Sequence, residues 1–139
     1  MDRVEDCVSF LVGKAAQQVS RRAREKLAPY EVTPTQYAVL KVLWEQDGRS
    51  AAELTARLLI DSATITGVVD RLEAARLLER RADREDRRIQ RLYLTEAGLA
   101  LSAPLDAAMD ALNAEVAELL GAEGPALWSE LRRLGEVEG

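Results

Sequence analysis

The chain has no histidine and only one cysteine, Cys7. The missing histidine excludes Ser-His-Asp triads and histidine general bases, and a lone cysteine excludes a disulfide within the chain. A zinc site would have to be built from carboxylates and one thiolate, which is a poor match to the usual ligand sets. The sequence also has no glycine-rich cofactor loop and no plausible nucleophile–base pair. We therefore expect no enzyme active site, no metal and no cofactor.

Long apolar segments are also missing. No stretch is long and apolar enough to cross a bilayer. The first residues, MDRVEDCVSF, mix acidic with apolar side chains and do not have the pattern of a signal peptide. A length of 139 residues suits one domain with its own core. We expect a single domain over residues 1–139 in a cytoplasmic protein that does not bind membranes.

Net charge is −5, but the charges are unevenly placed. Residues 80–91 contain six arginines and three acids, whereas residues 99–139 contain eight acids and two arginines. A basic patch on an acidic body is the asymmetry that a nucleic-acid footprint requires. By itself, the patch is equally compatible with a solvated charge run in a loop.

Helical periodicity and capping signals divide the first half of the chain. Apolar side chains at helical spacing predict a helix over residues 4–27, which ends at Pro29. The segment 33–36 (TPTQ) can form a capping box and predicts a second helix that ends near Gly48. A second capping box at 50–53 (SAAE) opens a short helix, and Asp61 caps a fourth helix whose buried face we expect to be Ile65, Val68, Val69 and Leu72.

The third and fourth helices are joined by about three residues, the spacing of a helix–turn–helix. The outer face of the fourth helix carries small or hydrogen-bonding residues, as a helix in the DNA major groove requires. A plain amphipathic helix has a similar outer face. The residues on this face are Ser62, Ala63, Thr64, Thr66, Gly67, Asp70 and Arg71.

An arginine-rich hairpin follows. Two short strands, one after Leu77 and one ending at Leu94, flank a polar turn over 83–87. A hairpin directly after a helix–turn–helix, with arginines at its tip, is typical of a winged DNA-binding domain. This combination favours DNA binding over the amphipathic-helix interpretation.

The terminal helices are more apolar than the core can cover. Thr95 caps a long helix in which Pro104 should cause a kink or a break, and Pro125 starts a last helix. We expect these helices and the first one to pack across a two-fold axis, which would place two recognition helices about 34 Å apart on a pseudo-palindromic operator. The expected interface residues are Val4, Val8, Leu11, Leu112, Val116, Leu119, Trp128 and Leu131.

Three motifs resemble the MarR family of bacterial regulators. The most specific is Asp86-x-Arg88-x5-Leu94-Thr95-x-x-Gly98, which fits the wing signature of that family. The segments 27–37 (LAPYEVTPTQY) and 61–73 (DSATITGVVDRLE) are also similar. The resemblance implies a mostly α protein with a small β-hairpin wing (α+β), a winged helix–turn–helix core over 33–95, and dimerisation helices over 1–28 and 96–139.

The resemblance implies a homodimeric, sequence-specific regulator that binds double-stranded DNA, most often as a repressor released by a small phenolic or aromatic-acid effector. Two positions depart from the family pattern: Gly67 stands where relatives often carry arginine, and Arg84 where proline is common. The ion pair of Asp86 should orient the wing, and Arg87 and Arg88 should enter the minor groove. The expected DNA-binding residues are Ser50, Ser62, Ala63, Thr64, Thr66, Gly67, Arg71, Arg84, Asp86, Arg87 and Arg88.

The effector is less well defined by the sequence. Phe10, Lys14, Tyr37 and Trp44 are candidates for an effector pocket, although ordinary core or surface positions explain them more readily. One alternative is a peroxide sensor that uses Cys7, although the neighbouring Asp6 should raise the pKa of the thiol. Another alternative is a winged-helix protein-interaction module without DNA binding, which salt dependence of duplex binding would distinguish.

Overall fold

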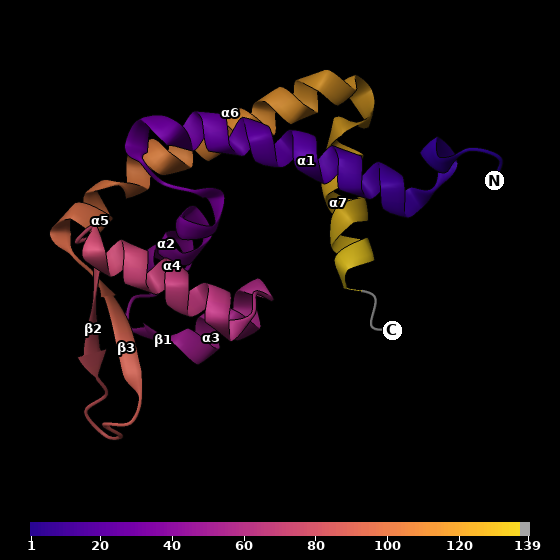
Figure 1. The fold of residues 1–139 in the computed structure, drawn as a ribbon. Coiled ribbons are helices and arrows are strands. Elements are labelled where there is room, and N and C mark those ends of the chain that lie inside the picture. Colours follow the sequence, from indigo (N-terminus) through magenta and orange to yellow (C-terminus); the bar gives the residue numbers. More distant parts are fainter. Residues whose placement is uncertain (137–139) are drawn as a thin grey trace.

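The computed structural model describes residues 1–136 as helices around a small sheet (Figure 1). A 3-10 turn, Val4–Asp6, precedes helix α1, Val8–Leu27. The first helix was expected to start at residue 4, but Cys7 is extended and forms its N-cap. A second 3-10 turn, Ala28–Tyr30, contains Pro29 and ends α1 as the sequence predicts.

The central part is a winged helix–turn–helix made of α2 (Pro34–Glu45), β1 (Arg49–Ser50), α3 (Ala51–Leu58), α4 (Ser62–Ala74), β2 (Leu78–Ala82) and β3 (Gln90–Leu94). The capping box at the start of α2 is present in full. Asp61 caps α4 by accepting the backbone N–H of Thr64. Ser50 caps α3, but the side chain of Glu53 pairs with Arg49 and Arg91 instead of closing a box.

The sheet has three antiparallel strands in the order β1-β3-β2. Leu78 pairs with Leu94 and Arg80 with Leu92, so these four side chains lie on one face of the sheet. Leu78, Leu92 and Leu94 are buried on that face. The hairpin is the expected wing, and strand β1 is an addition that the sequence pattern did not indicate.

The long helix after Thr95 is broken into two, which is one of the two outcomes expected from Pro104. Helix α5, Glu96–Ala100, ends at Leu101, and α6 runs over Ser102–Leu120. Because proline has no N–H and clashes with the carbonyl four residues earlier, Pro104 prevents the helix from continuing through Ala100. A 3-10 turn, Gly121–Glu123, leads to α7, Gly124–Gly135, which starts one residue before Pro125.

The hydrophobic core lies inside the winged domain. It is formed by the end of α1, by α2, α3, α4 and the sheet, and by Leu105 of α6. The expected inner face of α4 is buried in full. Figure 1 shows α1 beside α6 above this core, with α7 descending from the far end of α6. No helix among residues 1–136 is long and apolar enough to cross a membrane.

The first two thirds of α1 have no cover within one chain. Every residue from 8 to 21 is exposed, and only Ala23 and Leu27 of this helix are buried. Helix α7 likewise buries only Gly124. These helices carry exposed apolar side chains that a core of this size does not reach.

Candidate nucleic-acid interface

The outer face of α4 is a shallow surface of small and hydroxyl side chains. Ser62, Ala63, Thr64, Thr66, Asp70 and Arg71 are exposed, and Gly67 is half-buried. The Thr66 hydroxyl donates to the Ser62 carbonyl at 2.9 Å, and the Thr64 hydroxyl donates to Asp61 Oδ2 at 2.8 Å. Both hydroxyl oxygens still have lone pairs that can accept from a base edge or a water.

Gly67 leaves open space in the middle of this face. A Cβ built on it would meet only the Arg71 guanidinium, with Nη1 at 4.0 Å. The side chain of Arg71 therefore lies back along α4 over Gly67. This arrangement places a guanidinium over the position where relatives often carry their own arginine.

Asp61 ties the start of α4 to the turn before it. Its carboxylate accepts the Thr64 backbone N–H at 2.8 Å in addition to the hydroxyl bond. These two hydrogen bonds, the backbone one first, hold the pKa of Asp61 below its usual value. The helix thus begins on an ionised cap, which orients the residues that follow it.

Asp83 organises the turn of the wing. Its Oδ1 accepts from Arg91 Nε at 2.8 Å, and its Oδ2 accepts the backbone N–H groups of Glu85 and Asp86. The hydrogen bond from Arg91, followed by the one from the Asp86 N–H, lowers the pKa of Asp83. Sequence reasoning did not assign a role to Asp83 or Arg91, although an aspartate that opens a turn is a known signal.

The tip of the wing presents arginines to solvent. Arg88 donates from Nε and Nη2 to the two oxygens of Asp86, each at 3.0 Å, so the expected ion pair is present. The Arg88 side chain is still 90% exposed. Arg84 and Arg87 are exposed on the same tip. The paired carboxylate restricts Arg88 without hiding it.

Ser50 was expected to contact DNA, but it is almost fully buried. It is 8% exposed, and its hydroxyl accepts the Glu53 backbone N–H at 3.2 Å. It lies in the floor of a groove of about 500 Å³ between the start of α3 and the wing, which Arg87 and Arg88 also line. Ser50 therefore serves as the cap of α3 and has little surface of its own for DNA.

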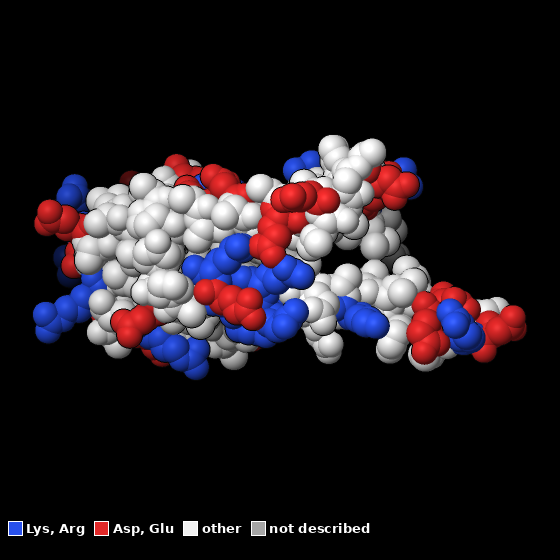
Figure 2. All heavy atoms as spheres, turned by 90° about the horizontal axis from the view of Figure 1, so that it is seen from above, with Lys and Arg blue, Asp and Glu red and all other residues white. Residues whose placement is uncertain are grey.

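The face formed by α1 and α6 has mixed charge. Figure 2, seen from above, shows basic side chains gathered near the centre with acidic ones directly beside them. Arg22 and Lys26 of α1 both pair with Glu115 of α6. This pairing compensates charge between the two helices.

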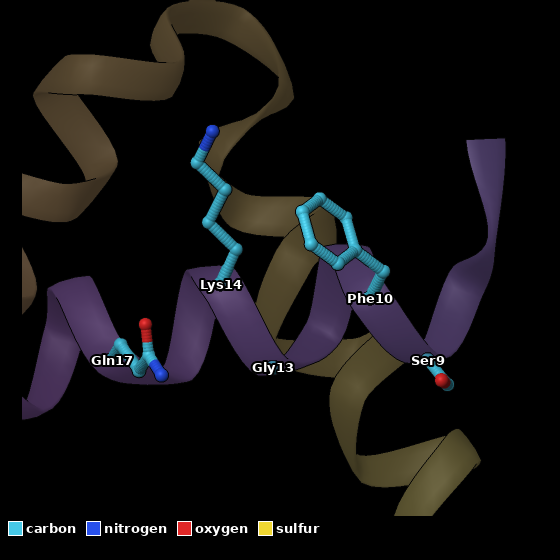
Figure 3. Close-up of a pocket in the computed structure, with 5 residues that line it drawn as sticks. All are labelled: Ser9, Phe10, Gly13, Lys14 and Gln17. Carbon is cyan, nitrogen blue, oxygen red and sulfur yellow. The ribbon is translucent and has the colours of Figure 1, made fainter. Parts of the chain in front are cut away.

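The four candidate effector residues form two separate pairs. Phe10 and Lys14 line a hollow of about 480 Å³ on α1 with Ser9, Gly13 and Gln17, and no residue of α2 lines it. Figure 3 shows the Phe10 ring and the Lys14 side chain on the same face of α1. Tyr37 and Trp44 instead pack edge to face with ring centres 6.0 Å apart.

Both aromatic side chains of α2 have partners inside the fold. The Tyr37 hydroxyl donates to Asp106 Oδ1 at 2.9 Å, and Trp44 Nε1 donates to the Gly98 carbonyl at 3.0 Å. Burial, and then the hydrogen bond to Asp106, raises the pKa of Tyr37. Tyr37 and Trp44 are thus half-buried and pack against the core, in line with the ordinary positions that the sequence left as the alternative.

Most of the expected interface residues are exposed apolar side chains. Val4, Val8, Leu11, Leu119 and Leu131 are each about half exposed or more. Val116 and Trp128 are half-buried. Leu112 differs, because it is only 7% exposed and packs within one chain. Other exposed apolar side chains on the same helices are Phe10, Val12, Val19, Leu120 and Leu134.

Cys7 is half-buried at the N-cap of α1, and its sulfur lies 3.8 Å from Ser9 Oγ. The pKa of this thiol is lowered, whereas Asp6 was expected from the sequence to raise it. The backbone N–H of Phe10, followed by the hydroxyl of Ser9, lowers the pKa. The start of a helix favours the thiolate because free N–H groups point toward it.

Together, the small-residue helix and the arginine-tipped hairpin define a winged helix–turn–helix protein of the DNA-binding class. Comparison with known proteins gives the family, because the MarR family profile matches residues 32–90. The regulator TtmR of Methylorubrum extorquens is 42% identical over 97 residues, which are 70% of this chain and 50% of TtmR. The chain therefore spans about half the length of that relative.

Two solved structures match over almost their whole length. A probable transcriptional regulator from Pseudomonas aeruginosa is 32% identical, with a TM-score of 0.89 over 95% of this chain and 99% of that one. BpsR of Bordetella bronchiseptica, whose DNA binding is regulated by 6-hydroxynicotinic acid, is 25% identical, with a TM-score of 0.91 over 99% of both chains. The chain belongs to the MarR family.

Proposed function

We propose that this chain is a homodimeric regulator that binds duplex DNA in a sequence-specific way, through the outer face of α4 and the tip of the wing. The observation that carries this proposal is the pairing of a shallow helix face with exposed arginines on the adjacent hairpin. A shallow face with hydroxyls and a guanidinium suits the major groove. Exposed arginines on a narrow hairpin suit the electronegative minor groove.

Duplex binding tests this proposal directly. Arg88→Ala should weaken binding to many sequences, because an arginine at the wing tip neutralises phosphate or enters the minor groove. Thr66→Val should change sequence preference instead, since one base contact contributes about 1–3 kcal/mol. Arg133→Ala is the matched control, because Arg133 is 80% exposed on α7 and far along the chain from the wing. If neither Arg88→Ala nor Thr66→Val changes the affinity for duplex DNA in a fluorescence anisotropy titration, this DNA surface is misplaced.

The exposed part of α1 supports the homodimer. Fourteen successive residues of a helix without internal cover are marginal in water on their own. Dimerisation is typical of the family, and a second copy would cover the apolar side chains of α1, α6 and α7. Light scattering at micromolar concentration should give twice the chain mass of 15.3 kDa. A mass equal to one chain would refute the dimer.

We further propose that a small aromatic carboxylate occupies the hollow at Phe10 and Lys14 and releases the DNA, as for a repressor. The Phe10 ring offers an apolar face and the Lys14 ammonium offers a charge for the carboxylate. Regulation of BpsR by an aromatic acid supports this class of effector. Titration calorimetry with 6-hydroxynicotinate and related acids tests it. Lys14→Gln should weaken binding, whereas Arg24→Gln, also on α1, should not.

The lowered pKa and the N-cap position of Cys7 favour a second candidate, sensing of organic hydroperoxides. The thiolate sulfur would attack one peroxide oxygen, the O–O bond would break, and the alkoxide would leave as an alcohol after taking a proton, which yields a sulfenic acid. Hydroperoxide should then release DNA from the wild type but not from Cys7→Ser. Equal behaviour of the two proteins would exclude this candidate.

A further inference from the structure

The outer face of α4 carries an acidic residue at its centre. Asp70 follows Ala63 and Gly67 at helical spacing, on the side opposite the buried Ile65 and Leu72. The Asp70 side chain is 61% exposed. If α4 lies in the major groove, this carboxylate faces a site rich in phosphate charge, where an unpaired anion is repelled.

Arg80 of β2 binds this carboxylate from the neighbouring element. Its Nη2 donates to Asp70 Oδ1 at 2.5 Å, and its Nη1 donates to Glu73 Oε1 at 2.7 Å. The Arg80 backbone N–H also donates to Glu73 Oε2 at 3.1 Å. One guanidinium therefore binds two carboxylates of α4, offsets one of their two negative charges, and fixes β2 against the same helix.

Arg80 has little left to offer DNA itself. Its side chain is 22% exposed, whereas Arg88 at the wing tip is 90% exposed. Both terminal nitrogens already donate to carboxylates. These bonds use two of the five N–H groups of the guanidinium, and its low exposure leaves little of the rest to reach a phosphate. We therefore expect Arg80 to affect DNA binding mainly through Asp70, Glu73 and the placement of the wing.

We propose that Arg80 is a positioning residue for DNA recognition, which offsets part of the negative charge of Asp70 and Glu73 on the recognition helix and holds the wing in register with it. This proposal rests on the proposed role of α4 in DNA binding. Without Arg80, the helix would carry two uncompensated carboxylates toward the duplex and the hairpin would lose its link to α4.

A double-mutant cycle on Arg80 and Asp70 tests the proposal. We expect Arg80→Gln to weaken binding to a selected duplex about tenfold, within the range of coupling between contacting residues. Asp70→Asn alone should change affinity less than about threefold, and it should restore part of the loss when added to Arg80→Gln, because Glu73 still lacks its partner. Arg81→Gln is the control, because Arg81 is on the same strand but pairs with Glu79 and not with α4.

A purely structural role predicts a different result. Arg80→Gln would then lower the melting temperature and the affinity together, and Asp70→Asn would not restore binding. That result, or wild-type affinity of Arg80→Gln, overturns the proposal. If the wild type binds no duplex at all, the proposed function fails instead.

A second variant covers the case in which Arg80→Gln does not fold. Arg80→Lys keeps the charge but cannot hold two carboxylates in a fixed fork, so we expect a loss of about threefold that Asp70→Asn restores. If Arg80→Gln does not fold and Arg80→Lys binds DNA as tightly as the wild type, the two-pronged guanidinium is not required and the proposal is overturned.

Discussion

Replacing Gly98 with alanine should destabilise the fold strongly, and the structure shows why this glycine ends the wing signature. A Cβ on Gly98 would stand 2.1 Å from the Leu77 carbonyl oxygen and 3.2 Å from a methyl group of Leu94. The same carbonyl accepts the Thr95 backbone N–H at 3.1 Å, and the Gly98 carbonyl accepts the Trp44 indole N–H. Alanine fits only if α5 moves away from the start of β2.

The expected loss of stability can be worked out from the contacts that this movement of α5 disrupts. Overpacking a tight site typically costs about 1–3 kcal/mol, and losing the Thr95 hydrogen bond to Leu77 adds about 1 kcal/mol. The better helix propensity of alanine returns about 1 kcal/mol. We therefore expect Gly98→Ala to lower the free energy of unfolding by about 1–3 kcal/mol.

Urea unfolding at one fixed protein concentration measures this change, because the stability of a dimer depends on concentration. Gly67→Ala is the matched control, since a Cβ there meets only the flexible end of Arg71 at 4.0 Å. The control should gain about 0.5–1 kcal/mol from helix propensity. If the free energies of unfolding of the two variants differ by less than about 0.5 kcal/mol, the steric explanation of Gly98 is refuted.

Two further predictions concern strain and pH. Leu59 is 86% exposed and left-handed, with φ of 53°, so Leu59→Gly should raise the free energy of unfolding by about 1 kcal/mol in a urea titration, and a decrease would contradict this. Burial raises the pKa of Asp106, but hydrogen bonds from Lys41 and Tyr37 lower it by more than burial raises it. The net pKa therefore lies below its usual value. A depressed folded-state pKa stabilises the protein above the unfolded value of about 3.9, and this stabilisation is lost as pH falls through the folded-state pKa. The stability difference between wild type and Asp106→Asn should therefore be constant from about pH 5 to 8 and shrink below about pH 4, whereas a difference that grows in acid would show the opposite shift.

Local signals explain most of the helix boundaries that could be predicted. The caps at Thr33 and Asp61 use side chains within three residues of the bonds they make, so sequence spacing is sufficient to find them. Pro104 likewise acts on the residue four positions earlier. The break at Leu101 was therefore foreseeable, although the sequence did not decide between a kink and a break.

Contacts between distant segments account for what the sequence did not indicate. Strand β1 has two residues, and it exists because Arg49 and Ser50 pair with β3 more than forty residues later. The indole of Trp44 was a candidate for an effector pocket, but its partner is the carbonyl of Gly98. Periodicity shows that such a side chain faces inward, and it does not show what the side chain meets.

The candidate DNA-binding site also contains some features that the sequence shows and others that only the fold shows. The ion pair of Asp86 and Arg88 lies within one turn and is visible in the motif. The role of Arg80 depends on two carboxylates of another element, and in the sequence it is one of six arginines in a charged run. Only the fold distinguishes the arginine that compensates the recognition helix from those that face solvent.

Selection of duplexes from a random library by the purified protein tests the central claim most directly. A homodimer that inserts two copies of α4 should enrich a pseudo-palindrome whose half-sites are about 10 base pairs apart, centre to centre. Affinity for the enriched duplex should fall steeply with salt, with a log–log slope of about −0.9 for each phosphate neutralised. Recovery of no common sequence, or binding that is insensitive to salt, would contradict the assignment of this chain as a DNA-binding regulator.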